Sequence, residues 1–238
     1  MKSRCILAGL LLLVSCTNRD TVQLSSVNPL HIHGHYAVEF NGETGSVRYF
    51  AQFRVGSSTG TTVQLDSPSE VLVDGKPLIE SRSPLVGTYY AFEEPMDELQ
   101  SSYQFMWKLL DGSQVKNRVF SAAPVSIQAP TPSSSHSRTE DLGISFSGDP
   151  ARSGNWVYGY LEGIDPDSGT EATVTIGSML SGNWLGIPHD KLRKFPLGTA
   201  RLWVLRERRN EPSEGHSDAG GLIRSTYRSP SIQIDIVH

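Results

Sequence analysis

The feature that most constrains the fold is a two-residue hydrophobic period that recurs along the chain without a sustained helical period. Apolar side chains occupy nearly every second position in the segments 32–40, 47–55, 103–109, 142–146, 172–176 and 232–236. Such alternation turns one face of a β-strand to a core and the other to solvent. Asn41-Gly42, Asp74-Gly75 and Asp111-Gly112 provide hairpin turns. Only residues 93–99 (EEPMDEL) offer a single turn of helix, so the sequence predicts an all-β protein.

The strand pattern falls into two units, 31–128 and 141–238. Between them, residues 129–140 (APTPSSSHSRTE) are rich in Pro, Ser and Thr, a composition typical of a linker. Short strands at about 8–12-residue spacing favour an immunoglobulin-like or fibronectin-like sandwich. We therefore expect two tandem immunoglobulin-like β-sandwiches, with a single larger sandwich as the alternative.

The N-terminus carries an export signal. Lys2 and Arg4 precede nine apolar residues, from Ile6 to Val14, a run far shorter than the ~20 residues of a membrane span. The run ends in Leu13-Val14-Ser15-Cys16, which resembles the lipobox of bacterial lipoproteins. That resemblance implies a signal peptide of residues 1–15, cleavage before Cys16, a diacylglycerol on the Cys16 thiol and an acyl chain on the new amine.

The same resemblance gives the protein a location. Two or more acyl chains hold a protein firmly in a bilayer, and the polar residues 16–30 are expected to form a lipidated tether. Thr17 stands where an Asp would resemble an inner-membrane retention signal. We therefore expect the protein in the bacterial cell envelope, on the outer membrane and facing the periplasm.

The cysteine count and the net charge exclude several kinds of site and one class of partner. Cys5 leaves with the signal and Cys16 carries lipid, and these are the only 2 cysteines. The mature body therefore has no disulfide, no thiol nucleophile and no cysteine-based metal site. The net charge is −4, which offers no basic field for nucleic acid. The expected partners are the lipid bilayer, through Cys16, and an envelope protein or glycan.

Three histidines offer the clearest candidate chemistry. His31, His33 and His35 alternate with core residues and are expected on the solvent side of one strand. Alternate residues of a strand lie about 6.6–6.8 Å apart, and three histidines with a water form a catalytic type of zinc site. A single strand does not easily wrap three ligands round one ion, so a plain polar face is the favoured interpretation. The alternative is an exported hydrolase or metal-dependent enzyme that uses these residues.

Aromatic residues give a second group of candidates. Trp156, Tyr158 and Tyr160 share one parity, with Val157 and Leu161 on the other. We expect this stripe to pack in the core; exposed, it would stack on sugar rings or a protein partner. Trp184 lies in a segment with Gly and Pro and is the better exposed candidate.

The predicted function is a non-enzymatic binding or structural module without a cofactor. Loops often carry recognition on sandwich folds, and two are expected to do so here: 181–189, and 206–221 at the mobile tip of a long hairpin. The binding candidates within them are Trp184, His189, Arg208, Arg209 and His216.

Overall fold

The fold is built almost entirely of strands. The computed structural model describes residues 21–148, 155–165, 169–178, 182–216 and 218–238. These residues form strands, two 3-10 turns and one short helix, so the predicted all-β class is confirmed. Cys16 and the lipobox lie outside the described residues.

The described strands form three sheets. The large sheet contains β1 (Thr21–Gln23), β2 (Ile32–Asn41), β3 (Ser46–Val55), β4 (Thr62–Gln64), β7 (Ile79–Ser83), β8 (Gly87–Pro95), β12 (Ser135–Ser137), β14 (Asn155–Ile164), β15 (Glu171–Ser178), β17 (Gly198–Asn210), β18 (Gly221–Arg228) and β19 (Ile232–Val237). The second contains β5 (Glu70–Val73), β6 (Lys76–Pro77), β9 (Ser102–Lys108) and β10 (Gln114–Phe120), and the third β11 (Ile127–Ala129), β13 (Leu142–Phe146) and β16 (Trp184–Ile187). The remaining elements are η1 (Leu24–Ser26), η2 (Pro29–His31) and α1 (His189–Leu192).

Two hydrophobic cores hold the sheets together. In the first core, one half of the large sheet packs on the second sheet, and Phe53 and Tyr36 meet Phe105 and Trp107. In the second core, the other half of the large sheet packs on the third sheet, with Leu202 among its buried residues. Each core therefore lies between two face-packed sheets, which is the sandwich arrangement.

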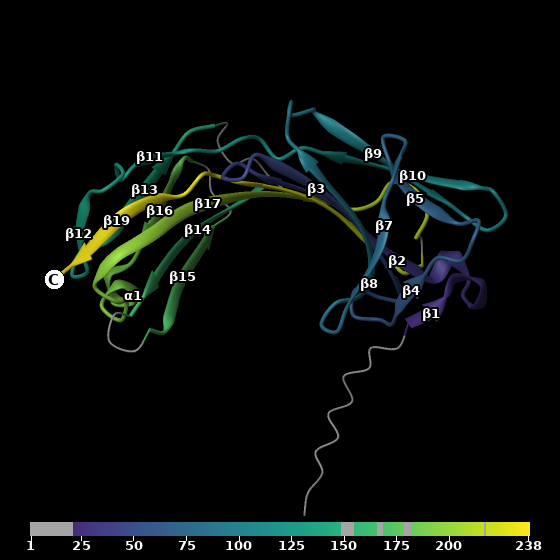
Figure 1. The fold of residues 1–238 in the computed structure, drawn as a ribbon, viewed down its shortest axis with the longest axis horizontal. Helices are drawn as coiled ribbons and strands as arrows, with labels where there is room; N and C mark the ends of the chain where they lie inside the picture. The colour runs from purple at the N-terminus through teal and green to yellow at the C-terminus, as the bar shows by residue number, and fades with distance from the viewer. Residues whose placement is uncertain (1–20, 149–154, 166–168, 179–181, 217) are drawn as a thin grey trace, which may run out of the picture.

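One continuous sheet joins the two cores. Strand β17 pairs with β19 at its start and with β18 at its end. Strand β18 then pairs in parallel with β2, from Gly221 opposite Gly34 to Arg228 opposite Asn41. The large sheet curves into an arch, and the two smaller sheets cover its convex side at either end (Figure 1). Its other face lines the concave side.

The structure corrects two expectations about segments outside the units. Residues 21–30 belong to the packed body and not to a free tether, because β1 pairs with β4 and Leu24 is buried in the first core. Residues 129–140 were expected to be a linker, but β12 within them pairs in parallel with β19. In both segments, backbone pairing to a distant strand overrides a polar local composition.

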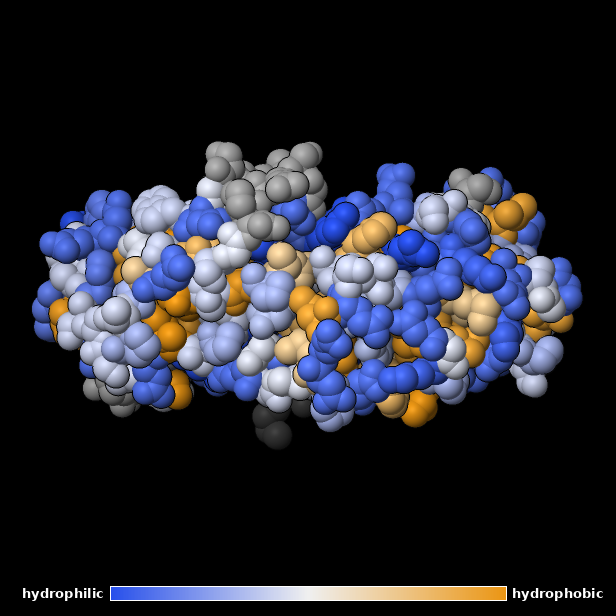
Figure 2. Space-filling view, turned by 90° about the horizontal axis from the view of Figure 1, so that it is seen from above, coloured by the Kyte–Doolittle hydropathy of each residue, from blue (hydrophilic) through white to orange (hydrophobic). Residues whose placement is uncertain are grey.

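The helix expected at residues 93–99 is also absent from the structure, because β8 continues to Pro95 and pairs with β3. No helix among the described residues is long and apolar enough to cross a bilayer. Figure 2 looks onto the convex side and shows hydrophobic residues interspersed with hydrophilic ones.

Candidate functional site

The three candidate histidines do not share one strand face. His33 and His35 lie on the outer face of β2, opposite buried Ile32 and Tyr36, as the alternation predicted. His31 instead ends the turn η2, and its Nδ1 lies 3.6 Å from Oδ2 of Asp218. The prediction that all three line one strand is therefore wrong, because the chain before Ile32 is a 3-10 turn.

The surroundings of His35 favour a neutral imidazole. Burial, followed by the nearby Arg224 guanidinium, lowers the pKa of His35 to about 4. The pKa of His33 is also lowered, mainly by burial. Within the described parts of the chain, no three His, Cys, Asp or Glu side chains are grouped so that they could hold a metal ion. Arginines beside the histidines also oppose the approach of a cation.

His216 is a core residue and not an exposed recognition residue. Its side chain is buried, with its Nδ1 2.6 Å from the carbonyl oxygen of Ile32 and its Nε2 2.9 Å from the hydroxyl of Tyr36. Its ring stacks on Trp107 at 5.6 Å between centroids. Gly34 makes room for it, since a Cβ there would lie 2.4 Å from His216 Nε2. The prediction failed because this histidine closes the first core from a loop far along the chain.

The segment around His216 is fixed to the first sandwich. Asn117 Oδ1 accepts hydrogen bonds from the backbone of Ser213 and Glu214, and Glu214 accepts one from Lys116 N. The expected mobile hairpin tip is therefore wrong for these residues. The hairpin itself exists as β17 and β18, and Ser217 lies outside the described residues.

The other binding candidates point in different directions. Arg208 lies on the core-facing parity of β17 and stacks over Phe120 at 4.8 Å. Arg209 lies on the opposite face and pairs with Glu207. Trp184 is 58% exposed on the third sheet, and His189 follows it in α1. The five residues do not converge on one site, and binding by Trp184 and His189 stays a prediction.

The aromatic stripe of β14 was expected in the core, and this is wrong. Val157 and Leu161 are the buried residues, so Trp156, Tyr158 and Tyr160 lie half-buried on the concave face of the large sheet. Which side chains of β14 are buried depends on which face of the strand packs against the third sheet. Either parity of this strand offers large hydrophobic side chains, so composition does not decide which one is buried.

Stacked side chains cross the concave face from strand to strand. Tyr160 stacks on Trp203 at 3.8 Å between centroids, and the guanidinium of Arg228 lies over the Trp203 ring, 4.4 Å from its centroid. On the first half, Arg48 lies over Phe50 at 5.5 Å and over Tyr89 at 5.8 Å. These cross-strand stacks stiffen the sheet and present ring edges to solvent.

Charges on this face are paired across strands. Arg48 NH1 lies 3.2 Å from Glu39, and Arg228 NH2 lies 3.4 Å from Glu43. Glu207 is almost fully buried between Arg209 and Arg224. The pairs neutralise one another, so the face combines aromatic edges with fixed ion pairs and has no strong field of one sign.

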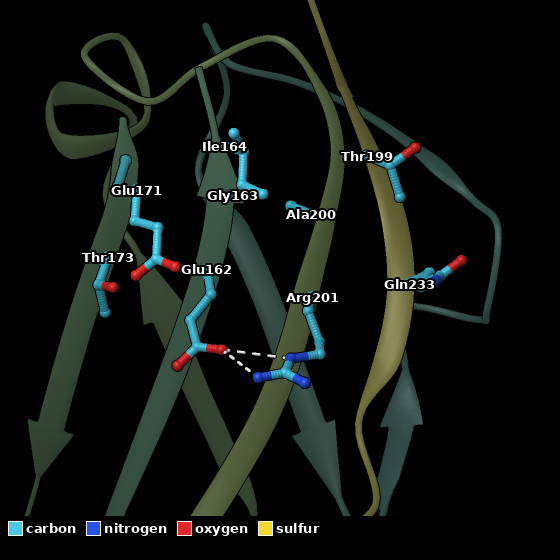
Figure 3. Close-up of a pocket in the computed structure, with 10 residues that line it drawn as sticks. Glu162, Gly163, Ile164, Glu171, Thr173, Thr199, Ala200, Arg201 and Gln233 are labelled. Carbon is cyan, nitrogen blue, oxygen red and sulfur yellow. Dashed lines mark hydrogen bonds and ion pairs between the residues drawn. The ribbon is translucent and has the colours of Figure 1, made fainter. Parts of the chain in front are cut away.

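A groove of about 400 Å³ forms the far end of the same face. Glu162 Oε2 accepts hydrogen bonds from both Arg201 Nε (3.2 Å) and Arg201 NH2 (2.7 Å) at its floor. Figure 3 shows this pair between β14 and β17, with Glu171 and Thr173 on one side and Gln233 on the other. The hydrogen bonding raises the pKa of Arg201. A second hollow of about 310 Å³ lies near the middle of the face, lined by Arg48, Glu39 and Arg228 among others.

His33, His35, Arg209 and the β14 aromatics thus belong to one surface. We call this surface the concave face; its outward residues are His33, His35, Glu39, Arg48, Phe50, Tyr89, Trp156, Tyr158, Tyr160, Glu162, Arg201, Trp203, Leu205, Glu207, Arg209, Leu222, Arg224, Thr226 and Arg228. The hydrophobic alternation of each strand of this face is visible in the sequence, but no local sequence pattern shows that β18 lies beside β2.

Comparison with known proteins adds no family. No family model matches the chain, and no curated protein matches it. Among solved structures, the chain is similar to fibronectin(III)-like modules of Clostridium thermocellum CbhA, with 13% identity over 86% of this chain and 92% of that one and a TM-score of 0.28. It is also similar to the IG1 and IG2 domains of DIP-gamma, with 9% identity over 87% and 98% and a TM-score of 0.22. Likenesses this weak carry no information about what the chain binds.

Proposed function

We propose that the protein is a non-enzymatic binding module of the bacterial cell envelope, tethered by lipid on Cys16. The module binds a partner protein on its concave face. The observation that carries this proposal is the composition of that face. Tyr, Trp and Arg are the residues most enriched in the energetic centres of protein interfaces. They recur here on the neighbouring strands β14, β17 and β18 and, on the other side of β2, on β3 and β8.

The size of the face fits a protein partner. Six strands, from β14 to β8, lie side by side, which at ~4.8 Å spacing spans ~24 Å. Along β17, the outward residues from Arg201 to Arg209 span ~27 Å at ~3.4 Å per residue. This patch approaches the ~800 Å² that a standard interface buries on each side.

Desolvation also favours binding here. The side-chain nitrogens His33 Nδ1, His35 Nε2, Trp203 Nε1, Arg224 Nε and Arg228 Nε are buried without a hydrogen-bond partner in the described chain. All five belong to the concave face. Because they are already removed from water, covering them with a partner adds little further desolvation cost.

The position of β1 supports a partner at the membrane surface. Strand β1 lies at the rim of the concave side (Figure 1). Only residues 16–20 separate Cys16 from β1, and five residues reach at most ~18 Å. A lipid on Cys16 would therefore hold the concave face close to the membrane surface, where a membrane-associated envelope protein would meet it.

Site-specific photocrosslinking in the native envelope tests the proposal. A photoreactive phenylalanine analogue at Phe50, on the concave face, should yield a discrete crosslinked protein. The same analogue at Leu110, in the turn after β9 and 37% exposed, is the control and should not. A Tyr158→Ser change should weaken the Phe50 crosslink, whereas Ser133→Ala should leave it intact. Equal crosslinking from both positions, or none from Phe50, would refute the concave face as the binding surface.

A further inference from the structure

A second surface, on the convex side, has the geometry of a sugar-binding platform. Trp184 lies on the outer face of the third sheet, since its neighbours Leu185 and Ile187 fill the second core. Its side chain is 58% exposed. Single exposed apolar side chains are common on protein surfaces, so what marks a site here is how this indole is held.

A pair of glycines forms the floor under this indole. Gly143 and Gly186 stand directly opposite each other on β13 and β16. A Cβ at Gly186 would lie 2.6 Å from Cη2 of Trp184, and a Cβ at Gly143 would lie 3.1 Å from its Nε1. The two ends of the indole therefore rest on the two glycines. The ring lies down along the sheet, with one face on the backbone and the other toward solvent.

A polar pair lies two residues along the chain from the glycine under the indole nitrogen. Asp141 precedes Gly143 by two residues, and its Oδ1 accepts hydrogen bonds from His189 N (2.7 Å) and from His189 Nδ1 (2.8 Å). These bonds lower the pKa of Asp141, so its carboxylate is charged at neutral pH. Both side chains are about half exposed or more. A carboxylate fixed in this way offers a hydrogen-bond acceptor for a hydroxyl group beside the ring.

We propose that Trp184 is a stacking platform for one pyranose ring of an envelope glycan, with Asp141 and His189 bonding its hydroxyls. A flat aromatic face packs against the axial C–H bonds of a pyranose, while the sugar hydroxyls point sideways to polar groups. A protein partner fits less well, because Ser145, Gly143 and Gly186 surround the indole on this face. They give none of the large apolar side chains that form the centre of a protein interface. This site is independent of the concave face, from which the sheet itself separates it.

Binding of soluble hexasaccharides tests the proposal. The probes are cellohexaose, chitohexaose, mannohexaose and β-galactohexaose, offered at millimolar concentrations to the full protein and followed by calorimetry. At least one should bind, and Trp184→Ala should weaken that binding about tenfold or more. Leu85→Ala, an exposed apolar side chain in the turn between β7 and β8 of the first sandwich, is the control and should change it less than about twofold.

A second variant separates stacking from support of the sheet. Gly186→Ala keeps the indole, but the added Cβ displaces the ring from its position against the backbone. This variant should also weaken sugar binding, while circular dichroism shows an intact fold. If no hexasaccharide binds, or if Trp184→Ala leaves the affinity unchanged, the proposal is wrong and the indole serves only to cover the glycines. Crosslinking from Phe50 would be unaffected by either result.

Discussion

At the scale of single residues, burial sets the chemistry of the histidines. His35 packs edge-on against Phe50 at 5.3 Å and sits near Arg224, and together these keep its imidazole neutral. His216 has a lowered pKa as well, mainly through burial. His33, His35 and His216 are thus parts of the packing, and their protonation opposes folding.

This gives a pH dependence of stability. The pKa of His35 falls from 6.5 to about 4 in the folded state, so the unfolded chain binds the proton first. The contribution of neutral His35 to the free energy of unfolding is therefore fully present above pH 6.5 and is lost as the pH falls toward 4. Urea unfolding should show wild type losing up to about 2 kcal/mol more than His35→Gln between pH 7.5 and 5. Equal losses in both proteins would contradict the assignment.

At the scale of elements, β18 decides how the halves are joined. It pairs with β17 on one side and with β2 on the other, and its Ile223 is buried in the first core. The chain breaks its strand at Ser229, whose backbone N–H donates to Val204 O and whose Oγ accepts from Val204 N. The following β19 then pairs near the start of β17.

Truncating the Ile223 side chain should therefore destabilise the first sandwich. Ile223→Ala is expected to lower the free energy of unfolding by about 2–5 kcal/mol, as for other buried Ile truncations. Leu222→Ala, the adjacent residue on the concave face, should cost clearly less. Chemical denaturation monitored by Trp fluorescence measures both. Comparable losses would mean that β18 contributes by backbone pairing alone.

At the scale of the whole molecule, the proposed lipid anchor limits how far the concave face can lie from the membrane. Cys16 should incorporate palmitate in cells, and Cys16→Ala should abolish labelling and release the protein from the membrane fraction. Cys5→Ser, at the other cysteine, should leave labelling unchanged. Metabolic labelling with membrane fractionation checks both variants. Full labelling of Cys16→Ala would remove the lipid anchor and, with it, the placement of the concave face near the membrane.

Local sequence signals were enough to predict the all-β class and most strand positions. Alternation and turn pairs are local signals, and they located strands such as β2, β3 and β9 together with the hairpin turns at Asp74 and Asp111. The exposure of Trp184 was also predicted, because its segment contains Gly and Pro and few large side chains that could cover the ring.

How the strands associate depends on contacts between distant parts of the chain. The parallel pairing of β18 with β2 joins residues that are far apart in the sequence, and no local pattern encodes a strand's distant neighbour. The same pairing carries His216 into the first core, and the packing of the third sheet turns Trp156, Tyr158 and Tyr160 outward. Alternation specifies that a strand has two different faces, but which face is covered depends on the sheet that packs against it.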